Sequence, residues 1–368
     1  MTMDANQLNF SAGPGALPAT VLEQVQEAVR AAPGAGLSIL GISHRSPWFA
    51  DVVAEVETRV RRLLGLPERY HVLLLQGGAT QQFSMLPMLL LRGHQTPADY
   101  LLTGYWSGKS VPEARREGRV RLLWDGSPEC FHRLPDDREL QFAADAAFFH
   151  YVSNETVEGL QFQRIPGLDT VPRICDMSSD FLSRPIQAER FQCIYAHAQK
   201  NLGPAGVTLV ILDDQLLTAK PADPSLPGFL DYREHVRTHS IYNTPPVFAI
   251  YVTLLVLRWL EDSIGGLAAM AAINQRKAAT LYAALDQYPD VFMGRARVQD
   301  RSLMNVVFTM PSPEIEQQFL HEAASAGFSG LGGHRAIGGL RASIYNGLEQ
   351  AACDRLAAFM TDFAAKRR

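Results

Sequence analysis

The chain has 368 residues, of which 47% are hydrophobic and 20% are charged, and its formal net charge is −4 at pH 7. This composition is typical of a globular protein large enough for two cores, and it lacks the excess positive charge of nucleic-acid-binding proteins. The most apolar run, residues 247–260, is too short to span a bilayer and contains Arg258. We therefore expect neither a nucleic-acid partner nor a membrane partner.

The N-terminus and the cysteines indicate a cytoplasmic protein. The first eighteen residues, MTMDANQLNFSAGPGALP, have neither the positive nor the apolar region of a secretory signal. The four cysteines, Cys130, Cys175, Cys193 and Cys353, are scattered without a CxxC pair. This pattern argues against a disulfide framework or a zinc site and fits a reducing compartment. We expect no metal.

The predicted elements begin with an irregular arm over residues 1–15. Residues 17–29 predict a helix with Pro18 in its first turn and Leu22, Val25 and Val29 on one face, and residues 48–65 predict a helix ended by Gly65. Helical segments then alternate with strand candidates at residues 71–75, 99–103, 120–124, 146–151, 171–177, 193–196 and 207–212. This alternation predicts an α/β fold whose mostly parallel sheet is sandwiched by helices and binds ligands at the carboxyl ends of its strands.

The pattern changes after a long helix predicted over residues 248–264, where Gly265 and Gly266 interrupt the chain. Helices are predicted at residues 267–285, 314–326 and 351–365, and strands at residues 303–310 and 340–346. We predict an N-terminal arm (1–15), a large domain (16–264) and a small C-terminal α/β domain (265–368).

Lys200 lies between two short apolar strands, in the segment CIYAHAQKNLGPAGVTLVILDD. A lysine in such a place is costly to desolvate unless it snorkels to solvent, is paired or is neutral. The ordinary interpretation is a loop lysine that snorkels. The alternative is a Schiff-base lysine, whose amine bonds to an aldehyde.

Asp176 ends an apolar strand 24 residues before Lys200 (200 − 176). It is either a helix N-cap or the carboxylate that pairs with a protonated pyridine nitrogen. Pyridoxal phosphate requires such a partner together with a lysine for its aldehyde. The two residues together therefore make this cofactor a candidate.

Three other strand ends carry residues suited to the same cofactor. The turn GGAT (77–80) joins a strand to a helix, where small residues let backbone amides surround a phosphate, and it fits neither the dinucleotide nor the P-loop spacing. Trp106, in TGYWSGK, could stack on a flat ring, and Thr156, in SNETVEG, could reach a ring substituent. Each has an ordinary alternative: a plain strand–helix turn, a core or surface tryptophan, and a helix cap.

Arginines in glycine-rich or loop contexts complete the set. Arg45 lies in SHRS, and Arg335 and Arg341 lie in GGHRAIGGLRAS. A guanidinium group binds a carboxylate or phosphate through two hydrogen bonds, although a solvated surface position is the commoner role.

The chain resembles the phosphoserine aminotransferases, a family of class V, fold-type-I pyridoxal phosphate enzymes. The resemblance covers essentially the whole chain and rests on NFSAGPGALP, ISHRS, GGATQQF, GYWS, SNETVEG, CDMSSDFLSRPI, YAHAQKNLGPAGVT, YNTPPVFAIY, MNVVF and GHRAIGGLRASIYN. It implies reversible transamination between L-glutamate and 3-phosphohydroxypyruvate, giving O-phospho-L-serine in serine biosynthesis. It also suggests 4-phosphohydroxy-L-threonine as a substrate in pyridoxine biosynthesis.

The resemblance also implies a role for each matching residue. Lys200 is the Schiff-base lysine, and Asp176 pairs with the pyridine nitrogen. The other implied cofactor contacts are Ala79, Thr80 and Gln199 at the phosphate, Trp106 on the ring, Thr156 near the ring hydroxyl, and Asn243 and Thr244 reaching the cofactor of the other subunit of a homodimer. The implied substrate contacts are Arg341 for the α-carboxylate, and His44, Arg45, His334 and Arg335 among the anion binders.

Two positions depart from the family pattern. Some members carry an arginine where this chain has Thr80, so one contact to the distal anion of the substrate is in doubt. His197 stands where a small residue is expected.

Other functions remain open at this point. Another class V aminotransferase, of the alanine–glyoxylate or serine–pyruvate type, would not need several arginines for a distal anion. A cysteine desulfurase would need a mobile loop cysteine, whereas Cys353 lies in a predicted helix and Cys130 precedes no matching motif. A non-catalytic protein that binds phosphorylated metabolites would have no cofactor absorbance.

Overall fold

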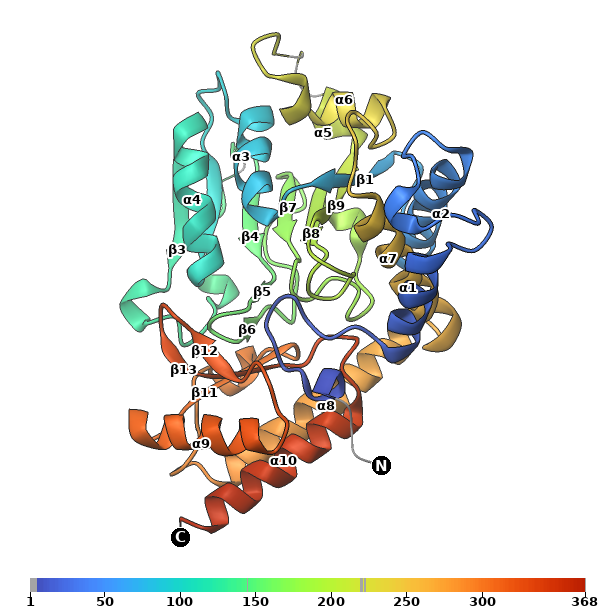
Figure 1. The fold of residues 1–368 in the computed structure, drawn as a ribbon. Helices are drawn as coiled ribbons and strands as arrows, with labels where there is room; N and C mark the ends of the chain where they lie inside the picture. Colours follow the sequence, from blue (N-terminus) through green and yellow to red (C-terminus); the bar gives the residue numbers. More distant parts are fainter. Residues whose placement is uncertain (1–4, 144, 219–220, 222, 368) are drawn as a thin grey trace.

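The computed structural model describes residues 5–143, 145–218, 221 and 223–367 (Figure 1). Residues 1–4 of the predicted arm and residue 368 of the predicted small domain lie outside this part. The helices are α1 (Ala19–Arg30), α2 (Pro47–Leu64), α3 (Ala79–Leu90), α4 (Tyr105–Glu117), α5 (Asp214–Thr218), α6 (Tyr232–Arg237), α7 (Val247–Arg258), α8 (Leu267–Gln287), α9 (Pro313–Ser325) and α10 (Gln350–Ala365).

Seven strands form the larger sheet, in the order β1-β9-β8-β7-β4-β2-β3. They are β1 (Tyr70–Gln76), β2 (Ala98–Leu102), β3 (Val120–Asp125), β4 (Phe149–Val152), β7 (Arg173–Asp176), β8 (Cys193–His197) and β9 (Val207–Asp213). Only β9 runs antiparallel to its neighbours, so the other six strands share one direction. The predicted α/β class and mostly parallel sheet are confirmed.

Alternate residues of the strands pack into two different cores, as the two-residue period of a strand requires. Val72 and Leu74 of β1 pack with α1, α2 and α7, whereas Leu73 and Leu75 pack with α3 and α4. Figure 1 shows these two groups of helices on either side of the sheet. Burial on both faces leaves the strand ends as the places where polar side chains can gather.

The termini of α2 show how local sequence sets a helix. The Ser46 hydroxyl accepts a hydrogen bond from the Phe49 amide at 3.2 Å, and Pro47 occupies the first turn. Gly65 ends the helix with φ at 61°, a left-handed conformation that glycine adopts without strain. The predicted end at Gly65 is confirmed.

A second sheet lies toward the C-terminus, with the strand order β10-β11-β13-β12 and antiparallel pairing throughout. Its strands are β10 (Met293–Gly294), β11 (Asn305–Thr309), β12 (Gly332–His334) and β13 (Gly338–Ser343). Helices α8, α9 and α10 share a separate hydrophobic cluster with this sheet, and Leu8 and Phe10 of the N-terminal segment belong to it as well. A short hairpin, β5 (Asn154–Glu155) and β6 (Leu160–Gln161), follows β4.

Several predicted details were wrong. On α1 the buried residues are Val21 and Ala28, and Val25 packs against the same core, whereas Val29 is 40% exposed. The packed face is therefore rotated from the predicted one and shares only Val25 with the residues predicted for it. The helix predicted over residues 248–264 ends at Arg258 and continues as a π-helical turn, Trp259–Ser263. The domain boundary predicted after residue 264 falls at the end of this turn, and the division itself stays a prediction.

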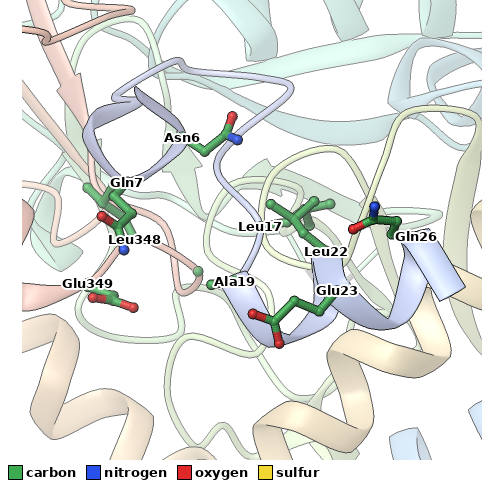
Figure 2. Close-up of a pocket in the computed structure, with 10 residues that line it drawn as sticks. Asn6, Gln7, Leu17, Ala19, Leu22, Glu23, Gln26, Leu348 and Glu349 are labelled. Atoms are coloured by element: carbon green, nitrogen blue, oxygen red, sulfur yellow. The ribbon is translucent and has the colours of Figure 1, made fainter. Parts of the chain in front are cut away.

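A cavity of about 230 Å³ lies between the N-terminal segment, α1 and the loop before α10. Figure 2 shows the residues that line it. Its lining includes Leu17, Leu22, Glu23 and Leu348 and contains no lysine, arginine or histidine. It lies away from the strand ends of the larger sheet, so it is not the place where the predicted site residues gather.

Within the described residues, no helix combines the length and the apolar character needed to cross a membrane. The same part of the chain contains no group of three histidine, cysteine or acidic side chains placed to hold a metal ion.

Candidate active site

Another cavity of about 230 Å³ opens at the carboxyl ends of β1, β2, β4, β7 and β8. These ends meet at one edge because the five strands run in the same direction. Six of the predicted cofactor residues line this cavity: Ala79, Thr80, Trp106, Asp176, Gln199 and Lys200. The remaining lining residues are Gly78, Val152, Asn154, Ser178, Ser179 and His197.

Lys200 is 8% exposed and lies in the turn that follows β8. Its Nζ donates a hydrogen bond to Thr156 Oγ1 at 2.7 Å and lies 5.5 Å from the centre of the Trp106 ring. Burial lowers the pKa of the Lys200 amine to about 8, while the charge of Asp176 opposes the change. The lowered pKa increases the fraction of Lys200 amine that is neutral and able to act as a nucleophile or base.

Asp176 is the last residue of β7 and is 4% exposed. Its Oδ1 accepts a hydrogen bond from the Ser178 amide at 2.8 Å, which fixes the orientation of the carboxylate. Burial raises the pKa of Asp176, whereas the Ser178 hydrogen bonds and the charge of Lys200 lower it. A cation bound in the cavity would favour the ionised carboxylate further.

The start of α3 forms a second polar part of the cavity. Gly77 has φ at 86°, and Gly78 precedes the helix without a capping side chain or an acidic residue in the first turn. The first-turn amides and the helix dipole favour an anion at this position. Gln199 lies beside it, held by a hydrogen bond from the Gly15 amide to the Gln199 carbonyl at 2.8 Å.

The first turn of α4, which carries Trp106, is held by two buried glutamates that sequence reasoning missed. The Trp106 and Ser107 amides each donate to the Glu155 carboxylate at 3.0 Å, and the Tyr105 amide donates to Glu158 Oε1 at 3.0 Å. Glu155 is 0% exposed and Glu158 is 1% exposed. Sequence reasoning missed these glutamates because SNETVEG has the composition of a polar loop. The signal that could have identified them is the pair of acidic residues on either side of Thr156, with no basic residue between them.

Arg341 lies close to Lys200 through a shared contact. The Arg341 side chain is 8% exposed, and its Nη1 donates to the Thr156 carbonyl at 3.3 Å, while Thr156 Oγ1 accepts from Lys200. Burial lowers the pKa of Arg341 below its usual range. Its Nε is buried without a hydrogen-bond partner in the described structure, so the guanidinium retains a donor for an anionic ligand.

The remaining predicted residues lie outside the cavity of this chain. Arg45, Arg335, Asn243 and Thr244 are exposed, and His44 and His334 are partly buried. The ring centres of His334 and Tyr105 are 4.6 Å apart, which brings His334 next to α4. The Thr244 carbonyl accepts a hydrogen bond from Gln76 Nε2. The structure therefore brings together the six cofactor residues that line the cavity, with Thr156 and Arg341 beside Lys200, but not these other residues.

The residues at the cavity fit pyridoxal phosphate. Lys200 provides an amine for the aldehyde, Asp176 a carboxylate for a protonated ring nitrogen, and Trp106 an aromatic face. The uncapped start of α3 provides backbone donors for a phosphate. The four groups approach one cavity from four different strand ends, as a flat molecule with distinct edges requires.

Comparison with known proteins gives a consistent result. The aminotransferase class-V family model matches residues 7–356. A phosphoserine aminotransferase of Rhodopirellula baltica is 46% identical over 359 residues, covering 97% of this chain and 95% of that protein. The solved phosphoserine aminotransferase of Bacillus circulans subsp. alkalophilus superposes with a TM-score of 0.94 at 42% identity, covering 98% of both chains.

A further solved structure, described as pyridoxal-phosphate-bound (PLP-bound) phosphoserine aminotransferase from Trichomonas vaginalis, has a TM-score of 0.90 at 38% identity. It covers 96% of this chain and 99% of its own. Sequence and structure thus agree over nearly the full length, and the chain belongs to the class-V aminotransferase family.

Proposed function

We propose that the chain uses pyridoxal phosphate to transfer the amino group of L-glutamate to 3-phosphohydroxypyruvate, forming O-phospho-L-serine and 2-oxoglutarate, and that it catalyses the reverse reaction. The observation that carries the proposal is the buried Lys200 amine, placed among Asp176, Trp106 and the open start of α3. The names of the similar proteins support the choice of substrates.

When bound, pyridoxal phosphate supplies an electron sink that stabilises negative charge at the substrate Cα. Lys200 Nζ holds the cofactor aldehyde and, once free, moves the proton at the substrate Cα. Its lowered pKa keeps part of the amine unprotonated near neutral pH, as a general base requires. Asp176 would accept a hydrogen bond from the protonated ring nitrogen of the bound cofactor and favour its charged form.

The other cavity residues orient the reaction. Trp106 would pack its face on the ring of the bound cofactor. Thr156 Oγ1, which accepts from Lys200 at 2.7 Å, would be the partner for the ring hydroxyl. The amides of Ala79 and Thr80, together with Gln199, bind the phosphate at the start of α3. These contacts would hold the cofactor and substrate in one orientation relative to Lys200 Nζ, which favours the proton transfer.

Substrate anions are bound by cationic side chains at two positions. Arg341, buried next to Thr156, binds the α-carboxylate, which all the amino acid substrates share. His334 and Arg335, together with Arg45, bind the distal phosphate or carboxylate, and His44 is a further residue of the anion-binding set. Thr80 contributes no positive charge, so these residues provide the charge that distinguishes a phosphorylated substrate from alanine.

The active unit is a homodimer in this proposal. Asn243 and Thr244 are exposed and do not line the cavity of their own chain, which supports a role at the cofactor phosphate of a neighbouring copy. His44 and Arg45, which precede α2, also do not line the cavity of their own chain. We therefore assign them to the active site of the neighbouring copy as well. The four cysteines are all unpaired, which supports a location in the reducing cytoplasm.

A panel of amino acceptors, with glutamate as donor, tests the substrate assignment. We expect kcat/KM for 3-phosphohydroxypyruvate to exceed that for pyruvate or glyoxylate by roughly 10²–10⁴-fold, because one or two charge-assisted hydrogen bonds to the distal phosphate are lost. The related 4-phosphohydroxy-L-threonine, assayed as donor with 2-oxoglutarate, should also be used because it carries the same distal group. Preference for glyoxylate or pyruvate would refute the proposal and favour an alanine–glyoxylate or serine–pyruvate type of aminotransferase.

A further inference from the structure

His197, the last residue of β8, has one ring nitrogen fixed by the sheet. Its Nδ1 lies 3.0 Å from Thr208 Oγ1 on β9, and Thr208 Oγ1 donates to the Gly77 carbonyl at 3.3 Å. A threonine hydroxyl has one proton, so towards His197 the oxygen can only accept. Hydrogen-bond counting therefore places a proton on Nδ1 and leaves Nε2 as the nitrogen available to a ligand.

Nε2 lies beside the start of α3. It is 3.8 Å from the position that a Cβ on Gly78 would occupy, and His197, Gly78, Ala79 and Thr80 line the same cavity. Gly78 precedes the first turn of α3, which has neither a side-chain cap nor an acidic residue. The imidazole edge and the anion-binding end of the helix thus face the same space.

We propose that His197 is an additional ligand of the cofactor phosphate, and that it takes up a proton when the phosphate binds. The proposal rests on the assignment of this cavity to pyridoxal phosphate. It adds a residue that the sequence comparison singled out only as a departure from the family pattern.

The proton uptake follows from the tautomer. With its proton on Nδ1, a neutral ring presents the lone pair of Nε2 to the cavity, and a lone pair repels a phosphate oxygen. The doubly protonated ring presents an N–H group instead and forms a charge-assisted hydrogen bond. Phosphate binding therefore selects the protonated ring.

The charges around His197 set the direction of the pH effect. In the ligand-free chain, burial and then the charge of Lys200 hold the pKa of His197 below its usual value. Asp176 on β7 is the acidic group that lines the cavity; Thr208 on β9 and Thr80 on α3 carry no charge. A phosphate dianion beside the ring raises the pKa. Between the two pKa values binding takes up a proton, so the affinity for the phosphate falls as pH rises.

The test measures binding rather than turnover. The ligand is 4′-deoxypyridoxine 5′-phosphate, which lacks the aldehyde and so cannot react with Lys200; 4′-deoxypyridoxine, without the phosphate, is its control. We expect His197→Gly to weaken binding of the phosphorylated ligand by about 10- to 100-fold near pH 7, the loss of one charge-assisted hydrogen bond, and to leave binding of the control ligand unchanged. His321→Gln, on an exposed position of α9, is the matched control variant.

Calorimetry in two buffers of different ionisation enthalpy measures the proton uptake. We expect up to one more proton to be taken up by the wild type than by His197→Gln, which keeps a side chain of similar length but cannot titrate. Thr208→Val leaves the cavity wall intact and removes the acceptor for Nδ1, so it should weaken binding in the wild type but not in the His197→Gly background.

The outcomes separate two questions. Failure of the wild type to bind pyridoxal phosphate at all would refute the proposed function. Tight binding by the wild type, with equal affinity and equal proton uptake in His197→Gly and His197→Gln, would refute only the role of His197.

Discussion

Replacing Glu158 with glutamine should make the free energy of unfolding less dependent on pH. Glu158 accepts a hydrogen bond from the Tyr105 amide, and its Oε2 is buried without a partner in the described structure. Burial and then the charge of Glu155 raise the pKa of Glu158 from 4.5 to about 8. A glutamine has nearly the same shape as the protonated acid and removes the titration.

The sign follows from proton linkage. Between pH 4.5 and 8 the folded chain binds more protons at Glu158 than the unfolded chain does. The contribution of Glu158 to the free energy of unfolding is therefore complete at low pH and is lost as pH rises through that window. The slope is at most about 1.4 kcal/mol per pH unit. From pH 6 to pH 7.5 the wild type should therefore lose on the order of 2 kcal/mol relative to Glu158→Gln.

Denaturant unfolding of both proteins across this range measures the difference. Glu68→Gln, at an exposed position, is the control and should follow the wild type at every pH. Parallel stability profiles for the wild type and Glu158→Gln would refute the reasoning, because they would show that Glu158 is ionised throughout.

Glu155→Gln should cost about 1–3 kcal/mol of stability near neutral pH. The Glu155 carboxylate accepts from the Thr103 hydroxyl and from the Trp106 and Ser107 amides. An amide nitrogen cannot accept, so at least one of these buried donors loses its partner. The loss should also loosen Trp106, and reduced cofactor affinity would report it.

Four further outcomes test the proposed roles. Lys200→Ala should abolish both transamination and the visible absorbance of bound cofactor while circular dichroism stays unchanged; survival of both signals would exclude Lys200. Asp176→Asn should retain some cofactor but lower kcat by about 10²–10³-fold, so near-normal turnover would contradict its pairing with the ring nitrogen. Arg335→Ala should reduce kcat/KM by about 10- to 100-fold for phosphoserine and glutamate but hardly for alanine, which has no distal anion. Arg341→Ala should reduce kcat/KM for all three amino acids. Equal losses on alanine and phosphoserine in Arg335→Ala would count against a role for Arg335 at the distal anion. Mixing the Lys200→Ala chain with an inactive Thr244 variant should form heterodimers that recover part of the activity. Heterodimers that form but remain inactive would disprove active sites built from residues of both subunits.

The parts of the site at strand ends could be predicted from the sequence. Asp176, Lys200 and the GGAT turn each follow a short apolar run, and such runs form parallel strands whose carboxyl ends meet. The prediction needed only the type and order of the elements. It therefore survived errors of two or three residues in strand bounds, such as β4, which begins at Phe149 rather than at residue 146.

Features that depend on tertiary packing could not be predicted. Strand β12 runs through Gly332 and Gly333, which have no apolar alternation, and a Cβ on Gly333 would lie 2.1 Å from the Gly338 carbonyl oxygen. The reversed direction of β9 leaves no mark on its own apolar sequence, since a buried strand reads the same in either direction. The burial of Glu155 depends on α4, which lies some fifty residues earlier in the chain.

The ionisable groups around Lys200 are better explained by function than by stability. Desolvation and the charge of Arg341 lower the pKa of the Lys200 amine to about 8, although the charges of Asp176, Glu155 and Asp180 oppose the change. Burying such a group of charges costs stability that apolar side chains of similar volume would not cost. A core selected for stability alone would not collect them at one edge of a sheet. In an aminotransferase the same arrangement has a use. It keeps the Lys200 amine partly neutral, as proton exchange at Nζ requires, and it places the Asp176 carboxylate where a cation can bind.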